Sequence, residues 1–378
     1  MTTGGPEADR AGEPDLTGVP AAALPTPALL LDPDVASRNI SQMAEAFGPL
    51  PARLRPHVKA HKCAELARLQ LESGAAGLTC ATVAEVAAFA RHCGAASRGA
   101  TALLLANQVA SVANLRVLAQ AAAAAPVTLA VESPEQAALA SLAATEAGTE
   151  LGVLIEVDVG AGRGGLRDLA QLAPLAAAVA RSPGLRLEGL MGYEGHATSE
   201  RSRARRRELV AGALAVLHAA AAELRRAGHE PRVVSAGGTG TFDLTGADPL
   251  VTEIQAGSYV LMDVFHQETS PQFGVAVTVA ATVLGRHGAL IVLDAGRKAL
   301  GGDLRPPRIA GLPRAELQFL NEEHCGFTVP GSAPRAGDQV RLICGYAPTA
   351  VNLYPWYHVV RDGIVTGCWP VIGRHGER

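Results

Sequence analysis

Short apolar runs alternate with longer amphipathic stretches through the first two thirds of the chain. The stretches between the runs, such as 133–147, 167–180 and 201–227, carry apolar residues at helical spacing. The runs themselves predict eight strands, at 53–58, 77–80, 101–105, 126–131, 152–157, 186–193, 232–236 and 253–259. Regular alternation of strand and helix predicts an α/β fold, and eight units favour a (β/α)8 TIM barrel. An open doubly wound sheet is the structural alternative.

The last third of the chain has a different pattern. From residue 274 strand is predicted to follow strand, at 275–284, 289–294, 339–344, 357–361 and 364–371, with Gly and Pro between the runs, as in a β domain. Residues 24–32 predict one further strand, which we expect to join this β domain. These patterns divide the chain into a flexible tail, a strand that joins the C-terminal β domain, the barrel, and the β domain itself, at 1–23, 24–34, 35–273 and 274–378.

Composition excludes several classes of function. The chain has 378 residues and a net charge of −3, which gives no electrostatic footprint for nucleic acid or an anionic membrane. No apolar run has the length of a membrane span, and the polar start resembles neither a signal nor a transit peptide. The six cysteines are far apart and form no CxxC pair, which favours reduced thiols in a cytoplasmic protein.

Lys59 is the strongest candidate for chemistry. It lies in Arg-Pro-His-Val-Lys-Ala-His-Lys, at the end of the first predicted strand, where barrels keep their catalytic groups. The neighbouring His57, His61 and Lys62 crowd positive charge, which lowers the pKa of a lysine and favours the neutral amine that forms Schiff bases. The alternative is that these groups are solvated loop cations.

Two glycine-rich loops follow the last two predicted strands, at 235–241 and 255–259. Glycine lets backbone N–H groups approach a phosphate, hydroxyl side chains add donors, and barrels commonly bind phosphate after strands seven and eight. Either loop alone would more simply be a turn.

Side chains with further functional potential follow strands five and six. Arg163 stands in a glycine-rich loop, where its fixed charge could face a ring nitrogen of a bound heterocycle; a solvated arginine is the alternative. Tyr193 and His196 place a phenol and an imidazole at the same end of the barrel. A buried core position is the alternative for the tyrosine.

These segments together resemble the D-threonine aldolase and D-serine dehydratase family of fold-type III, alanine racemase-like pyridoxal-phosphate enzymes. The resemblance runs in order through nearly the whole chain, at 26–28, 56–62, 156–165, 192–196, 237–241, 252–263, 294–303, 322–324 and 348–354. It implies that pyridoxal 5′-phosphate forms a Schiff base with Lys59 and that Arg163 faces the pyridine nitrogen. The remaining cofactor-binding residues that we expect are His57, Tyr193, Gly238, Thr239, Gly257, Ser258 and Tyr259. The resemblance also implies a homodimer in which the partner's β domain lines part of each active site.

One departure from the family concerns its metal. The family's lyases carry a His-x-Cys or His-x-Asp metal-binding pair just before a Pro-Thr, and here those two positions are Gly345 and Ala347. Neither side chain binds a metal, so we expect no divalent metal at the usual family site. The adjacent His324 and Cys325 have poor spacing for a replacement pair.

The resulting prediction is a pyridoxal-phosphate-dependent lyase that acts on a β-hydroxy D-amino acid by retro-aldol cleavage or dehydration. The substrate amine would displace Lys59, with Tyr193, His196 and Tyr346 as further catalytic candidates and His57 as another possible base. An amino-acid racemase or epimerase needs only Lys59 and a second base, for which Tyr346, Cys325 and His324 are candidates. A specialised biosynthetic aldolase and a cofactor-holding protein without turnover are the remaining alternatives.

Overall fold

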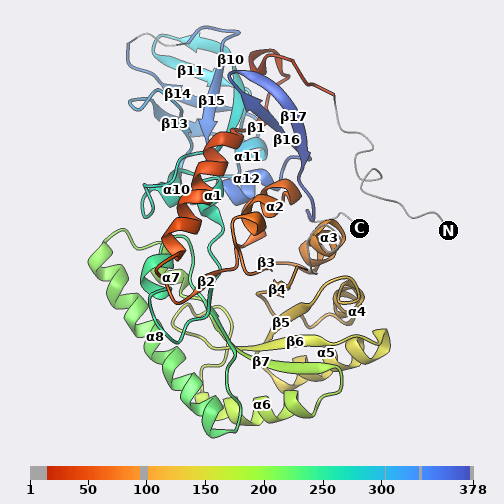
Figure 1. Ribbon diagram of the computed structural model, residues 1–378. Helices are drawn as coiled ribbons and strands as arrows, with labels where there is room; N and C mark the ends of the chain where they lie inside the picture. The colour runs from red at the N-terminus through yellow and green to blue at the C-terminus, as the bar shows by residue number, and fades with distance from the viewer. Residues whose placement is uncertain (1–14, 94–100, 303, 332–333, 375–378) are drawn as a thin grey trace, which may run out of the picture. The chain divides into compact units, whose positions relative to one another are not determined.

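The chain folds into two compact units (Figure 1). The computed structural model describes residues 15–93, 101–302, 304–331 and 334–374, so most of the expected N-terminal tail lies outside the described residues. The barrel unit comprises residues 43–59, 67–257 and 373–378, and the sheet unit comprises residues 1–42, 60–66 and 258–372. The chain leaves the barrel unit after Lys59 and again after Gly257.

The barrel unit contains eight parallel strands in the sheet order β2-β9-β8-β7-β6-β5-β4-β3. These strands are β2 (Arg53–Leu54), β3 (Leu78–Cys80), β4 (Leu103–Leu105), β5 (Val127–Val131), β6 (Leu151–Glu156), β7 (Leu185–Gly192), β8 (Val233–Ala236) and β9 (Glu253–Ile254). A parallel bridge between His57 and Thr79, with the Thr79 N–H donating to the Pro56 carbonyl at 2.8 Å, joins the two end strands. The ring is therefore closed, which confirms the barrel over the open sheet.

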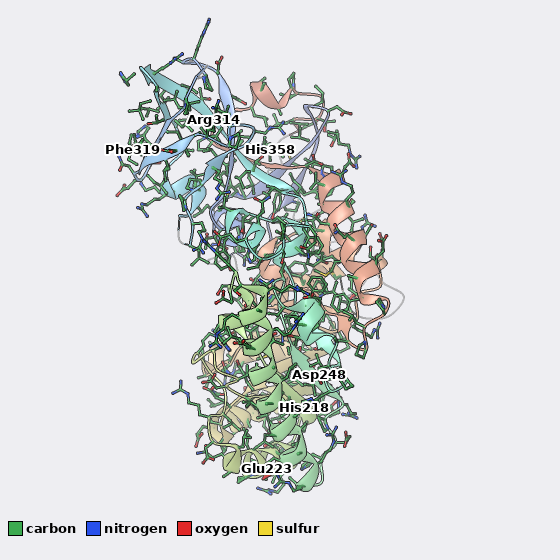
Figure 2. The ribbon with its side chains drawn as sticks, turned by 90° about the vertical axis from the view of Figure 1, so that its left-hand side faces the viewer. His218, Glu223, Asp248, Arg314, Phe319 and His358 are labelled. Carbon is green, nitrogen blue, oxygen red and sulfur yellow. The ribbon has the colours of Figure 1, made fainter. Side chains whose placement is uncertain are left out.

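Helices of the predicted period follow the barrel strands. The longer ones are α3 (Val83–Cys93), α4 (Val112–Ala121), α5 (Pro134–Ala147), α6 (Leu172–Arg181) and α8 (Arg203–Arg226), and the short ones are α7 (Gly195–Thr198) and α9 (Phe242–Thr245). As expected from a Ser-Pro start, the Ser133 side chain caps α5 by accepting from the Gln136 N–H, with proline at the first helical position. On the surface of α8, His218 contacts Asp248 at 3.0 Å (Figure 2).

The sheet unit is built on one mixed sheet with the path β13-β14-β11-β10-β1-β16-β17, and β15 pairs with both β10 and β12. The strands are β1 (Ala28–Leu31), β10 (Val277–His287), β11 (Leu290–Leu293), β12 (Arg308–Ile309), β13 (Glu316–Leu320), β14 (Cys325–Thr328), β15 (Gln339–Ile343), β16 (Trp356–Arg361) and β17 (Ile364–Pro370). Short helices α10 (Val264–Gln267), α11 (Arg297–Leu300) and α12 (Ala347–Val351) connect them. Helices α1 (Pro33–Phe47) and α2 (Ala64–Glu72) each cross the boundary between the units.

The N-terminal strand joins the C-terminal sheet, as predicted. Strand β1 pairs antiparallel with β10 and parallel with β16, and all four of its residues are buried. Upstream of it, the N–H groups of Gly18 and Ala21 donate to the carbonyls of Val365 and Gly363. Within the described residues, no helix has both the length and the apolar character needed to cross a membrane.

Candidate active site

Lys59 stands just beyond the first barrel strand. Strand β2 ends at Leu54, earlier than predicted, yet the Arg55 and His57 N–H groups continue its hydrogen bonds to the carbonyls of Ile254 and Ala256. Pro56 has no N–H to donate, and the chain then enters the 3-10 turn Val58–Ala60. The extended backbone therefore carries the lysine to the carboxyl end of the barrel strands.

The environment of Lys59 lowers its pKa to about 8. Burial is the larger cause because it penalises the ammonium form, and the charge of Arg163 adds to it, while Glu85 opposes both. A larger share of neutral amine is therefore present near neutral pH than on a solvated lysine. The expectation of a lowered pKa is confirmed, although the main causes are burial and Arg163 rather than the neighbouring cations of the segment.

Tyr193 brings two of the predicted site residues together. It follows β7, and the centre of its ring lies 5.9 Å from Lys59 Nζ and 5.5 Å from Arg163 Cζ. Both cations are within the range of attraction to an aromatic face. Burial raises the pKa of the Tyr193 phenol, so its hydroxyl stays protonated at neutral pH.

A buried carboxylate stands beside Arg163. Glu156, at the end of β6, lies 3.8 Å from the Arg163 guanidinium, and Gln108 hydrogen-bonds to it. Burial raises the pKa of Glu156 to about 7, while the arginine charge and the Gln108 hydrogen bond act in the opposite direction. The Asp158 carboxylate accepts from the N–H groups of Gly160 and Gly162 at 3.0 Å and so holds the loop that carries the arginine.

A second buried carboxylate fixes the glycine-rich loop after β8. Glu194, 1% exposed, accepts hydrogen bonds from the Gly237 N–H and from the hydroxyls of Thr241 and Thr245. The Gly238 N–H donates to Thr241 Oγ1 at 3.1 Å. A Cβ at Gly238 would lie 3.0 Å from Thr198 Cγ2 and 3.4 Å from Tyr193 Cε2, so glycine keeps this loop close to the tyrosine.

A close backbone contact also explains why residue 257, after β9, is a glycine. A Cβ at Gly257 would lie 2.4 Å from the carbonyl oxygen of the buried His57, so only glycine fits. His196 lies in α7 and packs its ring against Gly160, where an added Cβ would be 3.1 Å from the ring. Its Nδ1 is buried and has no hydrogen-bond partner among the described residues. Buried polar atoms are normally hydrogen-bonded, so this nitrogen could bind a ligand.

The barrel unit therefore fits pyridoxal phosphate. Lys59 supplies an amine of lowered pKa, Arg163 a guanidinium held against the Tyr193 ring, and Gly238 a glycine-rich loop that packs close to the same tyrosine. His196 adds a buried polar atom with unused hydrogen-bonding capacity. When bound, the cofactor would supply an electron sink for the bonds at a substrate's α-carbon.

Three predicted site residues belong to the sheet unit. Ser258 and Tyr259 form the 3-10 turn Ser258–Val260, and the Tyr259 ring is fully buried 5.7 Å from that of Phe273. This packing makes the Tyr259 ring part of the core of the sheet unit. Tyr346 precedes α12, where its ring stacks on that of His266 at 5.5 Å between centroids.

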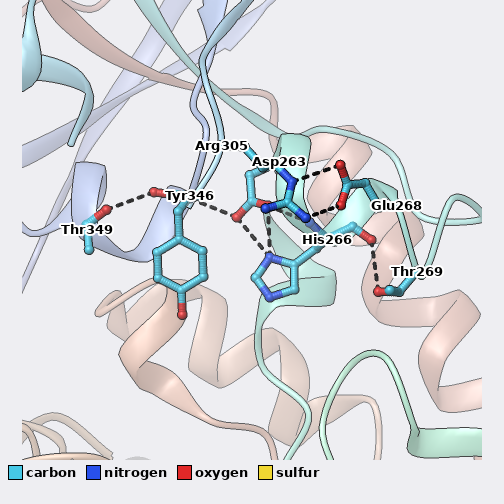
Figure 3. Close-up of polar contacts among 8 residues, drawn as sticks. Asp263, His266, Glu268, Thr269, Arg305, Tyr346 and Thr349 are labelled. Carbon is cyan, nitrogen blue, oxygen red and sulfur yellow. Dashed lines mark hydrogen bonds and ion pairs between the residues drawn. The ribbon is translucent and has the colours of Figure 1, made fainter. Parts of the chain in front are cut away.

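An aspartate–histidine pair lies beside Tyr346 (Figure 3). The Asp263 carboxylate is 2.9 Å from His266 Nδ1 and also accepts from the Ala347 N–H at 2.8 Å. The Val264 and Phe265 N–H groups donate to the carbonyls of Cys344 and Gly345. The segment 263–266 is therefore bound directly to the segment that carries the two positions of the family's metal pair.

The residues at those two positions do not fit a metal. A Cβ at Gly345 would lie 1.7 Å from the carbonyl oxygen of Arg305, so the backbone leaves no room for a ligand side chain there. Burial, and then the charge of Asp294, raises the pKa of Cys325 to about 12, which keeps this thiol protonated. Among the described residues, no group of three or more His, Cys, Asp or Glu side chains is arranged to hold a metal ion.

Sequence reasoning missed several residues of these clusters. Glu194 directly follows Tyr193 in the sequence. Its buried role could not be predicted, because a glutamate in an exposed loop would give the same sequence pattern. Glu156 ends a predicted strand, where it resembles any polar strand end. For Asp263 and His266 the spacing of three residues was the available signal, because it is the spacing at which an N-cap aspartate accepts from the third residue of the helix that follows.

Comparison with known families gives two matches along the chain. The family described as "Alanine racemase, N-terminal domain" matches residues 31–264. A second family, described as a serine dehydratase domain, matches residues 276–360. The two matches follow each other along the chain, the first over the barrel strands and the second over most of the C-terminal sheet.

Comparison with individual proteins extends the similarity to nearly the whole chain. A D-threonine aldolase of Arthrobacter sp. is 34% identical over 97% of each chain, and a 3-hydroxy-D-aspartate aldolase of Paracoccus denitrificans is 31% identical over 96% of this chain and 95% of its own. The crystal structure of D-threonine aldolase from Filomicrobium marinum superposes with a TM-score of 0.90 at 32% identity, covering 96% of this chain and 98% of that one. The D-threo-3-hydroxyaspartate dehydratase of Delftia sp. HT23 gives 0.81 at 26% identity over 93% and 99%.

Proposed function

Because the chain belongs to the alanine racemase N-terminal domain family, in its D-threonine aldolase-like branch, we propose that it is a pyridoxal-phosphate-dependent lyase of β-hydroxy D-amino acids. The observation that carries this proposal is the triad of Lys59, Arg163 and Tyr193 at the carboxyl end of the barrel strands. Lys59 would bind the cofactor, and the substrate amine would displace the lysine. Arg163, permanently charged, would keep the pyridine nitrogen unprotonated.

We propose that the bond broken is Cα–Cβ, by retro-aldol cleavage. This reaction needs a base that removes the β-hydroxyl proton, whereas dehydration needs an acid or a metal that helps hydroxide to leave. The backbone at Gly345 gives a ligand side chain no room, and this supports the reaction that needs only a base. Metal independence is part of the proposal.

The remaining site residues are assigned on the same basis. Gly238, Thr239, Gly257 and Ser258 would hold the phosphate, with His57 and Tyr259 beside them. Tyr193 and His196 would line the cofactor, and Tyr346 would stand on the side of the substrate. We also propose a cytoplasmic homodimer; the six cysteines, all free and buried, support a reducing compartment.

The test is product analysis with the cofactor-loaded protein. D-Threonine, L-threonine and D-3-hydroxyaspartate are incubated separately, and glycine, aldehydes and keto acids are quantified. Glycine and acetaldehyde from D-threonine but not from L-threonine support the proposal. A keto acid with ammonia would reassign the enzyme as a dehydratase. Appearance of the opposite enantiomer without cleavage would make it a racemase or epimerase.

A further inference from the structure

The arginine of the proposed cofactor site is half exposed. Arg163 lies in the glycine-rich loop after β6, and 53% of its side chain is open to solvent. The Tyr193 ring, whose centre is 5.5 Å from Arg163 Cζ, attracts the guanidinium only weakly at an exposed site, where hydration competes. A further group is therefore needed to hold the arginine over this ring.

Two carboxylates fix the backbone of the loop on both sides of Arg163. Asp158 accepts from the Gly162 N–H at 3.0 Å, and Glu132, which follows β5, accepts from the Gly165 N–H. These hydrogen bonds determine the course of the main chain. They leave the arginine side chain to be oriented by another group.

A third carboxylate, Glu156, faces that side chain. Glu156 Oε1 lies 3.8 Å from Arg163 Nη2, which is an ion-pair contact without a hydrogen bond. Only 5% of the Glu156 side chain is exposed, so water screens its charge less than it would on the surface. Burial raises the pKa of Glu156, and the Arg163 charge is the larger of the two effects that lower it, ahead of the Gln108 hydrogen bond. The carboxylate and the guanidinium are therefore coupled electrostatically.

Gln108 fixes the Glu156 carboxylate in turn. Its Nε2 donates to Glu156 Oε2 and, at 3.5 Å, to Glu132 Oε2, since a side-chain amide has two N–H donors. The three residues come from the carboxyl ends of the neighbouring strands β4, β5 and β6 or from the residues just after them. The Glu156 oxygen that Gln108 does not bind is the one that faces Arg163.

We propose that Glu156 is a positioning residue that holds the Arg163 guanidinium over the Tyr193 ring, and that Gln108 fixes Glu156 for this role. The role rests on the proposed cofactor site at Lys59. It deepens that proposal, because the arginine can act on a bound heterocycle only while its charge is kept at the site instead of in solvent.

The role has a measurable consequence at Lys59. The pKa of the lysine is set by burial, then by the Arg163 charge and, in the opposite direction, by the Glu85 charge. Glu156 is not among these causes, so it reaches the lysine only through the arginine. Without Glu156 the Arg163 side chain should turn toward solvent, and its repulsion of the lysine ammonium should weaken.

A double-mutant cycle on the apoprotein tests this consequence. The pH midpoint of pyridoxal-phosphate loading is measured by rapid-mixing absorbance for the wild type, Glu156→Gln, Arg163→Gln and the double variant. Glutamine has the size of glutamate and keeps an oxygen for Gln108, so the substitution removes charge without opening a cavity. We expect Glu156→Gln alone to raise the midpoint by about 0.5 pH unit or more. In the Arg163→Gln background the same substitution should leave the midpoint unchanged.

Two further variants complete the design. Glu188→Gln removes another strand glutamate that pairs with an arginine, Arg186, within β7, and it should load with the wild-type midpoint. Gln108→Ala keeps the charge of Glu156 but removes the amide that fixes it, so it should raise the midpoint by a smaller amount. This variant also tests the role if Glu156→Gln fails to fold.

Several results would overturn the proposal. A wild-type midpoint in Glu156→Gln, with a raised midpoint in Arg163→Gln, would make Glu156 a structural residue only. Equal shifts by Glu156→Gln in both backgrounds would mean that its charge acts on Lys59 directly. A wild-type midpoint in Gln108→Ala would refute the part assigned to the amide. If Lys59→Ala loads the cofactor as the wild type does, the proposed cofactor site itself fails, and that failure is distinguishable because it involves no Glu156 variant.

Discussion

Lys59 Nζ lies 5.9 Å from the centre of the Tyr193 ring, and the same ring carries Arg163 at 5.5 Å. One aromatic ring thus lies near two basic side chains that follow different strands of the barrel. The closeness of Arg163 has an electrostatic consequence for the lysine, because each positive charge disfavours the other. Burial and this repulsion together set the protonation state of the amine that would receive the cofactor.

The first prediction concerns the pH dependence of cofactor loading. Schiff-base formation needs the neutral amine, and the pKa of Lys59 is lowered from 10.5 to about 8. The loading rate of the apoprotein should therefore rise with pH and level off above about pH 8. Rapid-mixing absorbance measurements with pyridoxal phosphate from pH 6 to 10 test this. A midpoint near 10.5 would show that the lysine is solvated.

The second prediction concerns Arg163→Gln. Removing the arginine charge takes away one cause of the lowered lysine pKa but leaves burial, the larger cause, in place. The midpoint of the loading profile should therefore move to higher pH while staying below 10.5. Arg167→Gln, which removes an exposed arginine of the same loop, is the matched control. Identical profiles for the wild type and Arg163→Gln would refute the electrostatic coupling.

The third prediction concerns the buried carboxyl of Glu156. Its pKa is raised from 4.5 to about 7, so between these pH values the folded state binds more protons than the unfolded state. As pH rises from 4.5 to 7, the free energy of unfolding should therefore fall by up to about 3 kcal/mol because of this residue. Above pH 7 the residue should cause little further change. The glutamine of Glu156→Gln has no titratable group, so this variant lacks that pH dependence.

Urea unfolding of both apoproteins at pH 5 and pH 8 measures this contribution. The stability of the wild type relative to Glu156→Gln should be lower at pH 8 than at pH 5. An unchanged difference would mean that the carboxyl titrates at its ordinary pKa and that Arg163 fully compensates for its burial.

The fourth prediction concerns the backbone at Gly345. Because an added Cβ would lie 1.7 Å from the Arg305 carbonyl oxygen, Gly345→Ala should lower the free energy of unfolding by about 1–3 kcal/mol or more. Gly367→Ala, in β17 of the same unit, has no atom within 4 Å of the added Cβ and is the control. Chemical unfolding of both variants tests this. If Gly345→Ala and the wild type have equal free energies of unfolding, position 345 has room for a ligand side chain.

The barrel could be predicted from sequence because its signal is local. Each strand coincides with its own apolar run, and six of the eight runs match the observed strands to within two residues at their ends. The runs at 53–58 and 253–259 extend four and five residues beyond the ends of β2 and β9. The second predicted strand of the β domain, at 289–294, likewise contains β11. Strands β12, β13 and β14 were missed, because the segment from Arg308 to Thr328 mixes charged and apolar residues without a clear period.

The clusters that tune the site were largely beyond sequence reasoning because they are formed by distant residues. Arg305 and Gly345 are 40 positions apart, and nothing in either segment indicates that the carbonyl of one excludes a side chain at the other. Glu194 is identified as a loop anchor only when Gly237 and Thr241 are seen to donate to it. The place of Lys59 after the first barrel strand and its lowered pKa could be predicted, because a single segment carries both the strand end and several charged neighbours.

The central claim, cleavage of a β-hydroxy D-amino acid without a metal, is tested most directly by proton NMR of the cofactor-loaded protein with D-threonine in D2O. The sample is freed of metals by a chelator, and a parallel sample receives manganese. We predict α-deuterated glycine and acetaldehyde at similar rates in both samples, and no such products from L-threonine. Cleavage that appears only when manganese is added would contradict the account.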